Sequence, residues 1–205
     1  PAFLARVAGH VRLVRERHGI SDFVLTDNLV SPVVMAQLCE LNREQGLGIG
    51  WESMARFDRA YTRALCDLLA RGGCRRLDLG LETASNEGLR KLRKGITTEL
   101  VVDNLRNLKA AGIQTKVFAM HYPGQSLQEY EETLRFLRQH QELIDEVALS
   151  RFSIARDTNC HMGFAQLVDS DQADLDVFSV PHDRADELSL GALVEVTRRH
   201  FPDHW

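Results

Sequence analysis

The chain has 205 residues and a mass of 23.2 kDa, and its content of 44% hydrophobic and 26% charged residues excludes a disordered or fibrous protein. Its formal net charge of −4 gives no electrostatic basis for binding nucleic acid, because nucleic-acid binders carry a clear basic excess. No apolar run is long enough to cross a bilayer, so we expect no membrane partner either.

Short strand-like runs alternate with helical patterns along the chain. The expected strands are residues 21–27, 47–53, 75–82, 114–121 and 145–154. Between them, Ser31 and Pro32 begin a helix as N-cap and first-turn proline, and Ser126 forms a capping box with Glu129. Strands that recur with a helix between them imply right-handed βαβ units and a parallel sheet.

This pattern predicts an α/β fold, specifically a partial (βα) TIM-like barrel. A GxGxxG motif, which would favour a dinucleotide-binding sheet, does not follow the first strand. Five strands are too few to close an eight-stranded barrel, so we expect an open barrel or one whose first strand is missing. We assign residues 1–158 to this barrel and 159–205 to a C-terminal extension with an acidic loop and an amphipathic helix.

The four cysteines give no sign of a metal site. Cys39, Cys66, Cys74 and Cys160 include no pair with CxxC spacing, so zinc or cluster binding by this chain alone is not expected. Cys39 and Cys66 fall on apolar helix faces, where we expect buried, reduced thiols. Secretory features are absent from the sequence, so we expect a cytoplasmic protein.

Polar and aromatic side chains gather at the predicted strand ends, where parallel α/β folds bind their ligands. They are Asp27, Asn28, Trp51, Glu52, Arg56, Glu82, Thr83, Ser85, His121, Tyr122, Arg151 and Ser153. For any one of them, capping a helix or pairing with a loop is the commoner role. As a set, they predict a rim that holds a polar, zwitterionic or multiply hydrogen-bonded ligand.

Two longer stretches resemble a known family. "GLETASNEGLRKLRKGITTE" (80–99) resembles the fourth-strand segment of radical S-adenosylmethionine (SAM) enzymes, most of all the subgroup that often carries a cobalamin-binding domain ahead of the barrel. "GIQTKVFAMHYPGQSLQEYEETLRFL" (112–137) resembles the fifth unit of the same family, with a Pro-Gly turn and a threonine, Thr133, in the following helix. The resemblance covers roughly residues 1–155 and implies a radical SAM-type barrel.

The resemblance implies that Glu82 lies in the pocket that holds SAM. SAM presents an ammonium group, ribose hydroxyls and a sulfonium, all of which favour a carboxylate partner. Thr83 and Ser85 would add hydroxyl contacts. The alternative is that Glu82 caps the following helix or pairs with Arg90 or Lys91.

Five further residues complete the expected SAM-binding set: Trp51, Arg56, His121, Tyr122 and Arg151. Trp51 would stack on the adenine or on a substrate ring, although a buried structural tryptophan is the commoner outcome. His121 and Tyr122 stand where the family more usually has glycine and a hydrophobic residue. They would fill the pocket, bring a proton donor near a substrate, or simply pack.

One family feature is absent from the sequence. Radical SAM enzymes bind a [4Fe-4S] cluster through three cysteines, usually spaced CxxxCxxC, and the cluster chelates SAM and donates the electron that cleaves it. No such triad occurs here. Because the chain begins without Met, we expect a segment ahead of Pro1 to supply the triad, and we expect this fragment alone to be inactive. Cobalamin use would depend on a further domain.

Two alternatives stay open. One is a degenerate, non-catalytic barrel that binds a small polar ligand or a protein partner. The other is a different barrel enzyme that holds a divalent metal at Asp27, Glu52, Glu82 and His121. The substrate, the type of reaction and the oligomeric state are not encoded in any of these motifs.

Overall fold

The computed structural model describes residues 2–27, 29–122, 124–151, 153–155, 177–179 and 190–201. The chain divides into two compact units. The first unit consists of Pro1–Leu81, Glu99–Val117 and Glu142–Val147. The second unit consists of Glu82–Thr98, Phe118–Gln141 and Ala148–Trp205.

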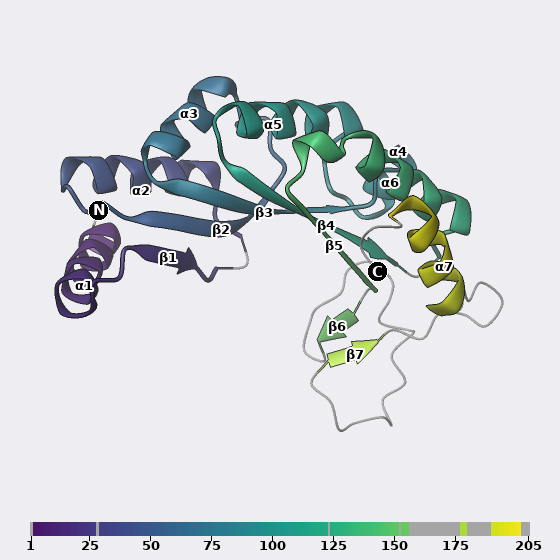
Figure 1. Cartoon of the computed structure of the whole chain (residues 1–205), viewed down its shortest axis with the longest axis horizontal. Coiled ribbons are helices and arrows are strands. Elements are labelled where there is room, and N and C mark those ends of the chain that lie inside the picture. The colour runs from purple at the N-terminus through teal and green to yellow at the C-terminus, as the bar shows by residue number, and fades with distance from the viewer. Residues whose placement is uncertain are drawn as a thin grey trace. The chain divides into compact units, whose positions relative to one another are not determined.

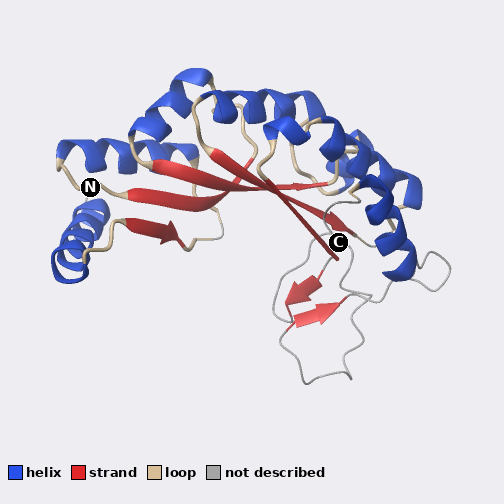
Figure 2. Cartoon of the chain, in the orientation of Figure 1, coloured by secondary structure: helices blue, strands red, loops and turns tan. Residues whose placement is uncertain are grey.

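Helices and strands alternate along the chain (Figures 1 and 2). The helices are α1 (Ala2–His18), α2 (Pro32–Glu44), α3 (Arg63–Arg71), α4 (Asn86–Lys91), α5 (Thr98–Ala110), α6 (Leu127–Gln139), the 3-10 helix η1 (Gln141–Leu143) and α7 (Leu190–His200). The strands are β1 (Asp22–Leu25), β2 (Gly50–Arg56), β3 (Cys74–Glu82), β4 (Gln114–His121), β5 (Glu146–Arg151), β6 (Ser153–Ala155) and β7 (Val177–Ser179).

Strands β1 to β5 form one sheet in sequence order, and β1, β2 and β3 pair in parallel. The predicted α/β fold with a parallel sheet is therefore confirmed. The strand at 114–121 has the predicted bounds, whereas β2 begins and ends three residues later than expected.

The predicted strand at 145–154 is wrong as a single element. It ends at Arg151, and β6 pairs antiparallel with β7 in a separate two-stranded sheet. The cause is long-range, because the hydrogen-bond partners of β6 lie more than twenty residues further along the chain. The predicted domain boundary at 158/159, the acidic loop and Cys160 lie outside the described residues. Helix α7 falls within the predicted terminal helix.

The predicted helix starts are confirmed. The Ser31 hydroxyl accepts a hydrogen bond from the backbone N–H of Val34, and Pro32 occupies the first turn of α2. At α6, the Ser126 side chain accepts from the Glu129 N–H while the Glu129 carboxylate accepts from the Ser126 N–H. Both caps satisfy amide groups that a helix leaves without internal partners.

Strand β3 separates buried from partly exposed side chains. Leu77, Leu79 and Leu81 are fully buried, and Asp78 and Glu82, which alternate with them, are partly exposed. Successive side chains of a strand point to opposite faces of the sheet, so leucines and acidic residues occupy different faces. In the first unit, α2, α3 and α5 lie along one side of the strands (Figure 1).

Packing in the first unit buries the thiols predicted to be structural. Cys39 and Cys66 are buried, and desolvation raises the pKa of Cys39 to about 12 and that of Cys66 to about 11. A Cβ added at Gly72 would lie 2.2 Å from the Cys39 Cβ, so helix α2 approaches the backbone there too closely for any other residue. These thiols stay protonated and inert at neutral pH.

An asparagine that carried no signal in the sequence joins α2 to the segments just before β2 and β3. Asn42 is buried, and its amide donates to the carbonyls of Ile49 (3.0 Å) and Gly72 (2.9 Å) while its oxygen accepts from the Ile49 N–H (3.2 Å). Trp51 donates from its indole Nε1 to the same Gly72 carbonyl at 2.9 Å. Every polar group brought into this part of the core therefore has a partner.

In the second unit, α6 packs on α7. Tyr130 and Leu134 of α6 form a buried cluster with Leu193 and Val196 of α7. The Tyr130 hydroxyl lies 3.2 Å from the Thr197 hydroxyl, so the polar end of this ring is satisfied inside the cluster. Within the described ranges, no helix is both long enough and apolar enough to span a bilayer.

Asp145 makes the stability of the first unit sensitive to acid. Its carboxylate accepts from the Thr115 N–H (2.8 Å) and from Lys109 Nζ (2.8 Å). Burial alone would raise the pKa of Asp145, but the bonds to Lys109 and Thr115 outweigh burial and leave it below its ordinary value of 3.8. The stabilisation is therefore present above about pH 3.8 and is lost as the pH falls through the lower, folded-state pKa.

We expect Asp145→Asn to lower the free energy of unfolding by about 1 kcal/mol at pH 7, since it keeps the shape and loses the charged hydrogen bonds. The difference from wild type should shrink as the pH falls below 3.8. Urea denaturation at pH 7, 4 and 3 measures both effects. The control Asp103→Asn, whose side chain is 68% exposed, should be near neutral throughout. A deficit for Asp145→Asn that is constant with pH would contradict this account.

Candidate functional site

The last residue of β3, Glu82, has an unusual backbone conformation. Its φ is 69°, in the left-handed region, and in the part of the chain that the structure describes Arg93 (φ 50°) is the one other non-glycine residue with positive φ. A side chain with a Cβ pays roughly 1–2 kcal/mol for this conformation. Such strain persists only where the surroundings enforce it, and it concentrates at functional sites.

The Glu82 carboxylate forms an ion pair with Lys94 Nζ at 3.3 Å. The side chains are 22% and 11% exposed, so the pair is largely shielded from water yet reachable from it. The predicted alternative of a pair with Arg90 or Lys91 is wrong in its partner. Lys91 pairs instead with Glu87 on its own helix, α4, and with Glu129 on α6.

Thr83 and Ser85 both make hydrogen bonds within the second unit. Thr83 is fully buried and lies 3.2 Å from the Thr133 hydroxyl, and Ser85 is the N-cap of α4, accepting from the Gly88 N–H at 3.1 Å. Both hydroxyls therefore build the loop that carries Glu82. Their predicted contacts with SAM stay predictions.

His121 and Tyr122 lie in the interior of the second unit. Both are 2% exposed, and the His121 ring meets the Tyr130 ring of α6 edge to face, with centroids 5.8 Å apart. Burial, and then the charge of Glu129, raises the pKa of Tyr122 to about 12, so its phenol stays protonated at neutral pH. His121 falls on the buried set of the alternation along β4, which favours the packing role among those considered for it.

The structure corrects the position of Trp51. Because β2 runs from Gly50 to Arg56, Trp51 lies at the amino end of the strand, 1% exposed, and not at the carboxyl end. Arg56, predicted just beyond the strand end, is instead the last residue of β2, is exposed, and is in register with Gly80. Arg151 ends β5, and its side chain lies outside the described part.

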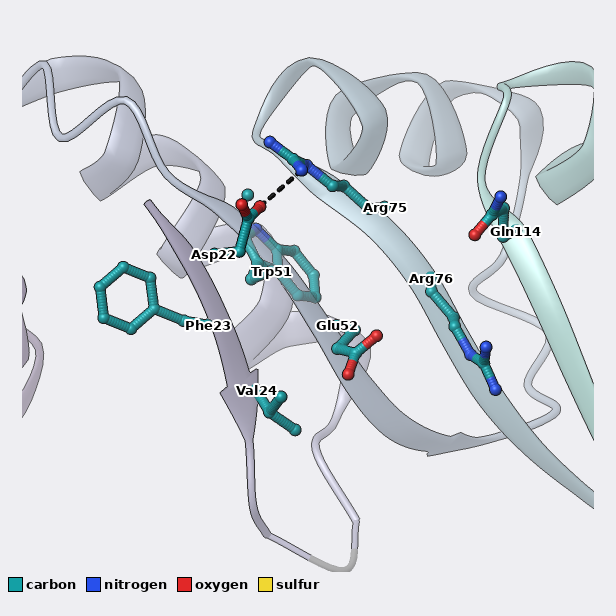
Figure 3. A pocket seen from close by; sticks show the side chains of 9 residues that line it. Asp22, Phe23, Val24, Trp51, Glu52, Arg75, Arg76 and Gln114 are labelled. Carbon is teal, nitrogen blue, oxygen red and sulfur yellow. Dashed lines mark ion pairs between the residues drawn. The ribbon is translucent and has the colours of Figure 1, made fainter. Parts of the chain in front are cut away.

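A pocket of ≈ 290 Å³ lies at the amino ends of the strands in the first unit (Figure 3). Arg75 pairs with Asp22 at 2.5 Å across Gly50, where an added Cβ would lie 2.2 Å from Arg75 Nε. Figure 3 shows the Glu52 carboxylate between Val24 and Arg76. Arg76 is itself engaged by Asp78 and Glu146, both at 2.7 Å. The lining residues are Asp22, Phe23, Val24, Gly50, Trp51, Glu52, Arg75, Arg76 and Gln114.

The described residues contain no group of three or more His, Cys, Asp or Glu side chains that could hold a metal ion. The alternative metal site at Asp27, Glu52, Glu82 and His121 therefore does not form among them. The cysteines also do not fit a [4Fe-4S] cluster, which needs thiolates. Cys39, Cys66 and Cys74 are buried, and desolvation raises the pKa of each.

The geometry thus defines a portion of a parallel α/β barrel with a strained, paired carboxylate at the carboxyl end of β3. Residues 4–137 match the model of the radical SAM superfamily, which is well over half of the chain. The chain belongs to the radical SAM superfamily.

Known proteins similar to the chain share this family. It is 27% identical over 97 residues to the uncharacterized methyltransferase PH0819 of Pyrococcus horikoshii, which covers 47% of this chain and 21% of that protein. The cobalamin-dependent SAM radical enzyme OxsB matches with a TM-score of 0.60 at 20% identity, over 71% of this chain and 23% of OxsB. Coproporphyrinogen III oxidase (HemN) of Escherichia coli matches with a TM-score of 0.61 at 17% identity, over 96% of this chain and 42% of HemN.

The chain therefore spans between about a fifth and two fifths of the lengths of these proteins. At these identities the two structural likenesses establish the fold, a partial barrel of the radical SAM type. The fold itself is shared by enzymes named for different reactions.

Two substitutions at Glu82 separate its backbone conformation from its charge, because both remove the ion pair with Lys94. Glycine adopts positive φ without strain, so we expect Glu82→Gly to exceed Glu82→Ala in free energy of unfolding by about 1 kcal/mol. The matched pair Glu87→Gly and Glu87→Ala, inside α4, should show the reverse order, because glycine costs about 1 kcal/mol in a helix. Chemical denaturation measures all four; the same order at both sites would rule out strain at Glu82.

The packing beneath the loop is tested at Gly88. An added Cβ would lie 2.6 Å from the Tyr122 hydroxyl and 2.8 Å from Thr83 Cγ2, both buried, so Gly88→Ala should cost about 1–3 kcal/mol. At Gly9, in α1, an added Cβ would meet nothing within 4 Å, so Gly9→Ala should instead raise the free energy of unfolding by about 0.5–1 kcal/mol. Thermal unfolding distinguishes the two, and similar shifts in Tm would show that Tyr122 and Thr83 do not fill the space beside Gly88.

Proposed function

We propose that this chain is the SAM-binding barrel portion of a radical SAM enzyme and that the Glu82 carboxylate holds SAM. The observation that carries the proposal is the placement of Glu82. It ends β3 at positive φ, on the face opposite the buried leucines, with its side chain 22% exposed. Ligands of parallel α/β barrels bind at this end of the strands.

The residues present fit SAM in charge and in hydrogen bonding. A carboxylate accepts several hydrogen bonds, and the pair with Lys94 engages one oxygen, Oε1, at 3.3 Å. This distance is longer than the 2.7–2.9 Å of a tight charged hydrogen bond. The Glu82 carboxylate can therefore accept hydrogen bonds from a ligand as well as from Lys94. The ammonium group or a ribose hydroxyl of SAM would supply the remaining donors.

When bound together, SAM and a reduced [4Fe-4S] cluster supply radical chemistry. The described cysteines of this chain do not fit that cluster, so its ligands must come from elsewhere in the enzyme. The role of this chain's residues is to bind SAM, orient it at the end of β3, and shield the Glu82–Lys94 pair from water.

Cobalamin is a proposal supported by structural neighbours such as the cobalamin-dependent OxsB and by the sequence resemblance. Methyl transfer is supported in the same limited way by the methyltransferase of Pyrococcus horikoshii. HemN shares the fold and is named for an oxidation, so the barrel by itself does not select the reaction.

Substitution of Glu82 by glutamine tests the proposal. In the protein at its full natural length, Glu82→Gln should weaken SAM binding by about 1.5–3 kcal/mol, the value of a lost charged hydrogen bond, which is roughly 10- to 150-fold in Kd. Equilibrium dialysis with labelled SAM measures this without requiring turnover.

Glu132→Gln is the matched control in the same unit, since Glu132 lies on α6 and accepts a hydrogen bond from Gln128. It should leave the Kd unchanged. Equal affinities for wild type and Glu82→Gln would remove Glu82 from the site. Absence of SAM binding by wild type would favour the degenerate barrel with another polar ligand.

A further inference from the structure

The Thr133 hydroxyl on α6 is the centre of a hydrogen-bonded chain within the second unit. It lies 3.2 Å from the Thr83 hydroxyl, accepts from the backbone N–H of Ala84 at 3.0 Å, and donates to the Glu129 carbonyl at 3.1 Å. Thr133 is 1% exposed and Thr83 is fully buried, so water does not substitute for these bonds. One helical side chain therefore contacts both residues that follow Glu82.

The hydroxyl protons of Thr83 and Thr133 can be assigned consistently with these hydrogen bonds. A hydroxyl has a single proton, and that of Thr133 goes to the Glu129 carbonyl, so Thr133 accepts from Thr83 and from the Ala84 N–H. The Thr83 hydroxyl, having donated, accepts from Gln125 Nε2 at 3.4 Å and from the Ser85 N–H at 3.3 Å. The bonds run in one direction, from Gln125 through Thr83 and Thr133 to the backbone of α6, and reinforce one another.

These hydrogen bonds of Thr133 explain what enforces the strained conformation of Glu82. The next two residues, Thr83 and Ala84, are held by Thr133, which lies 49 residues beyond Ala84. Left-handed backbone at a residue with a Cβ persists only where its neighbours are fixed. We propose that Thr133 is a positioning residue that holds the backbone after Glu82 and thereby aims the Glu82 carboxylate, an inference that rests on the proposed function of Glu82.

Helix stability alone does not account for the threonine. Threonine is a poor helix former, and a hydroxyl that bonds back to the i−4 carbonyl slightly destabilises a helix. Valine would fill the same buried volume without that bond. What the hydroxyl adds here is the link to Thr83 and Ala84, at the end of a strand that is remote in sequence.

The test is a double-mutant cycle on SAM affinity. Thr133→Val removes the hydroxyl and keeps the shape, and should weaken SAM binding about tenfold, whereas Thr133→Ser, which keeps the hydroxyl, should stay within about twofold of wild type. In the Glu82→Gln background, Thr133→Val should have no further effect, because it acts through Glu82. Thr133→Ala serves as a second hydroxyl deletion in case the valine variant does not fold.

Thr197→Val is the matched control. Thr197 is also a buried threonine on a helix of the second unit, and it donates to its i−4 carbonyl, that of Leu193, at 2.7 Å and lies 3.2 Å from the Tyr130 hydroxyl. These two bonds join Thr197 to residues of α6 and α7 and do not involve residues 83 and 84. Both Thr197→Val and Thr133→Val remove a buried hydroxyl and should lower Tm. Thr197→Val should leave SAM affinity unchanged.

The outcomes separate this inference from the proposed function. If Glu82→Gln weakens SAM binding and Thr133→Val causes the same loss in both backgrounds, or none in either, Thr133 is merely structural and the inference is overturned. If Glu82→Gln does not weaken SAM binding, the proposed function itself fails and the inference fails with it. Loss of affinity confined to the wild-type background and rescued by Thr133→Ser would establish the positioning role.

Discussion

The two-residue period of strand β3 is the constraint on which the site depends. Leu77, Leu79 and Leu81 take one face of the sheet because they are buried, so Glu82 must lie on the other. The next step is conformational: at φ 69° Glu82 ends the strand, and the chain enters α4 after three further residues. Burial of leucines and exposure of one carboxylate are thus two results of the same geometry.

The end of β3 is fixed by groups that must be satisfied once they are buried. Thr83, Thr133 and the Ala84 N–H lose access to water and compensate one another, which joins the strand end to α6. Tyr122 and Thr83 both pack close to Gly88. Buried side chains of the second unit therefore support the loop that follows Glu82.

The chain belongs to a family that uses an iron–sulfur cluster, but its described cysteines are not suited to bind one. The chain belongs to the radical SAM superfamily, yet Cys39, Cys66 and Cys74 are buried thiols whose raised pKa values oppose metal binding. The described residues thus provide a scaffold and a carboxylate, that of Glu82, at the end of β3. Fold likeness to a cobalamin-dependent enzyme and to HemN shows that such a scaffold is shared by enzymes named for different reactions.

By itself, the sequence determined what local patterns encode: the βαβ order, the β4 strand, the capping box at Ser126 and the acid at the end of β3. Tertiary structure alone decided the partner of Glu82, which is Lys94, and the end of β2 at which Trp51 lies. It also decided that 145–154 is two strands and that Thr133 holds the loop. Periodicity and caps act over a few residues, whereas register and buried hydrogen bonds join residues tens of positions apart, which no local pattern specifies.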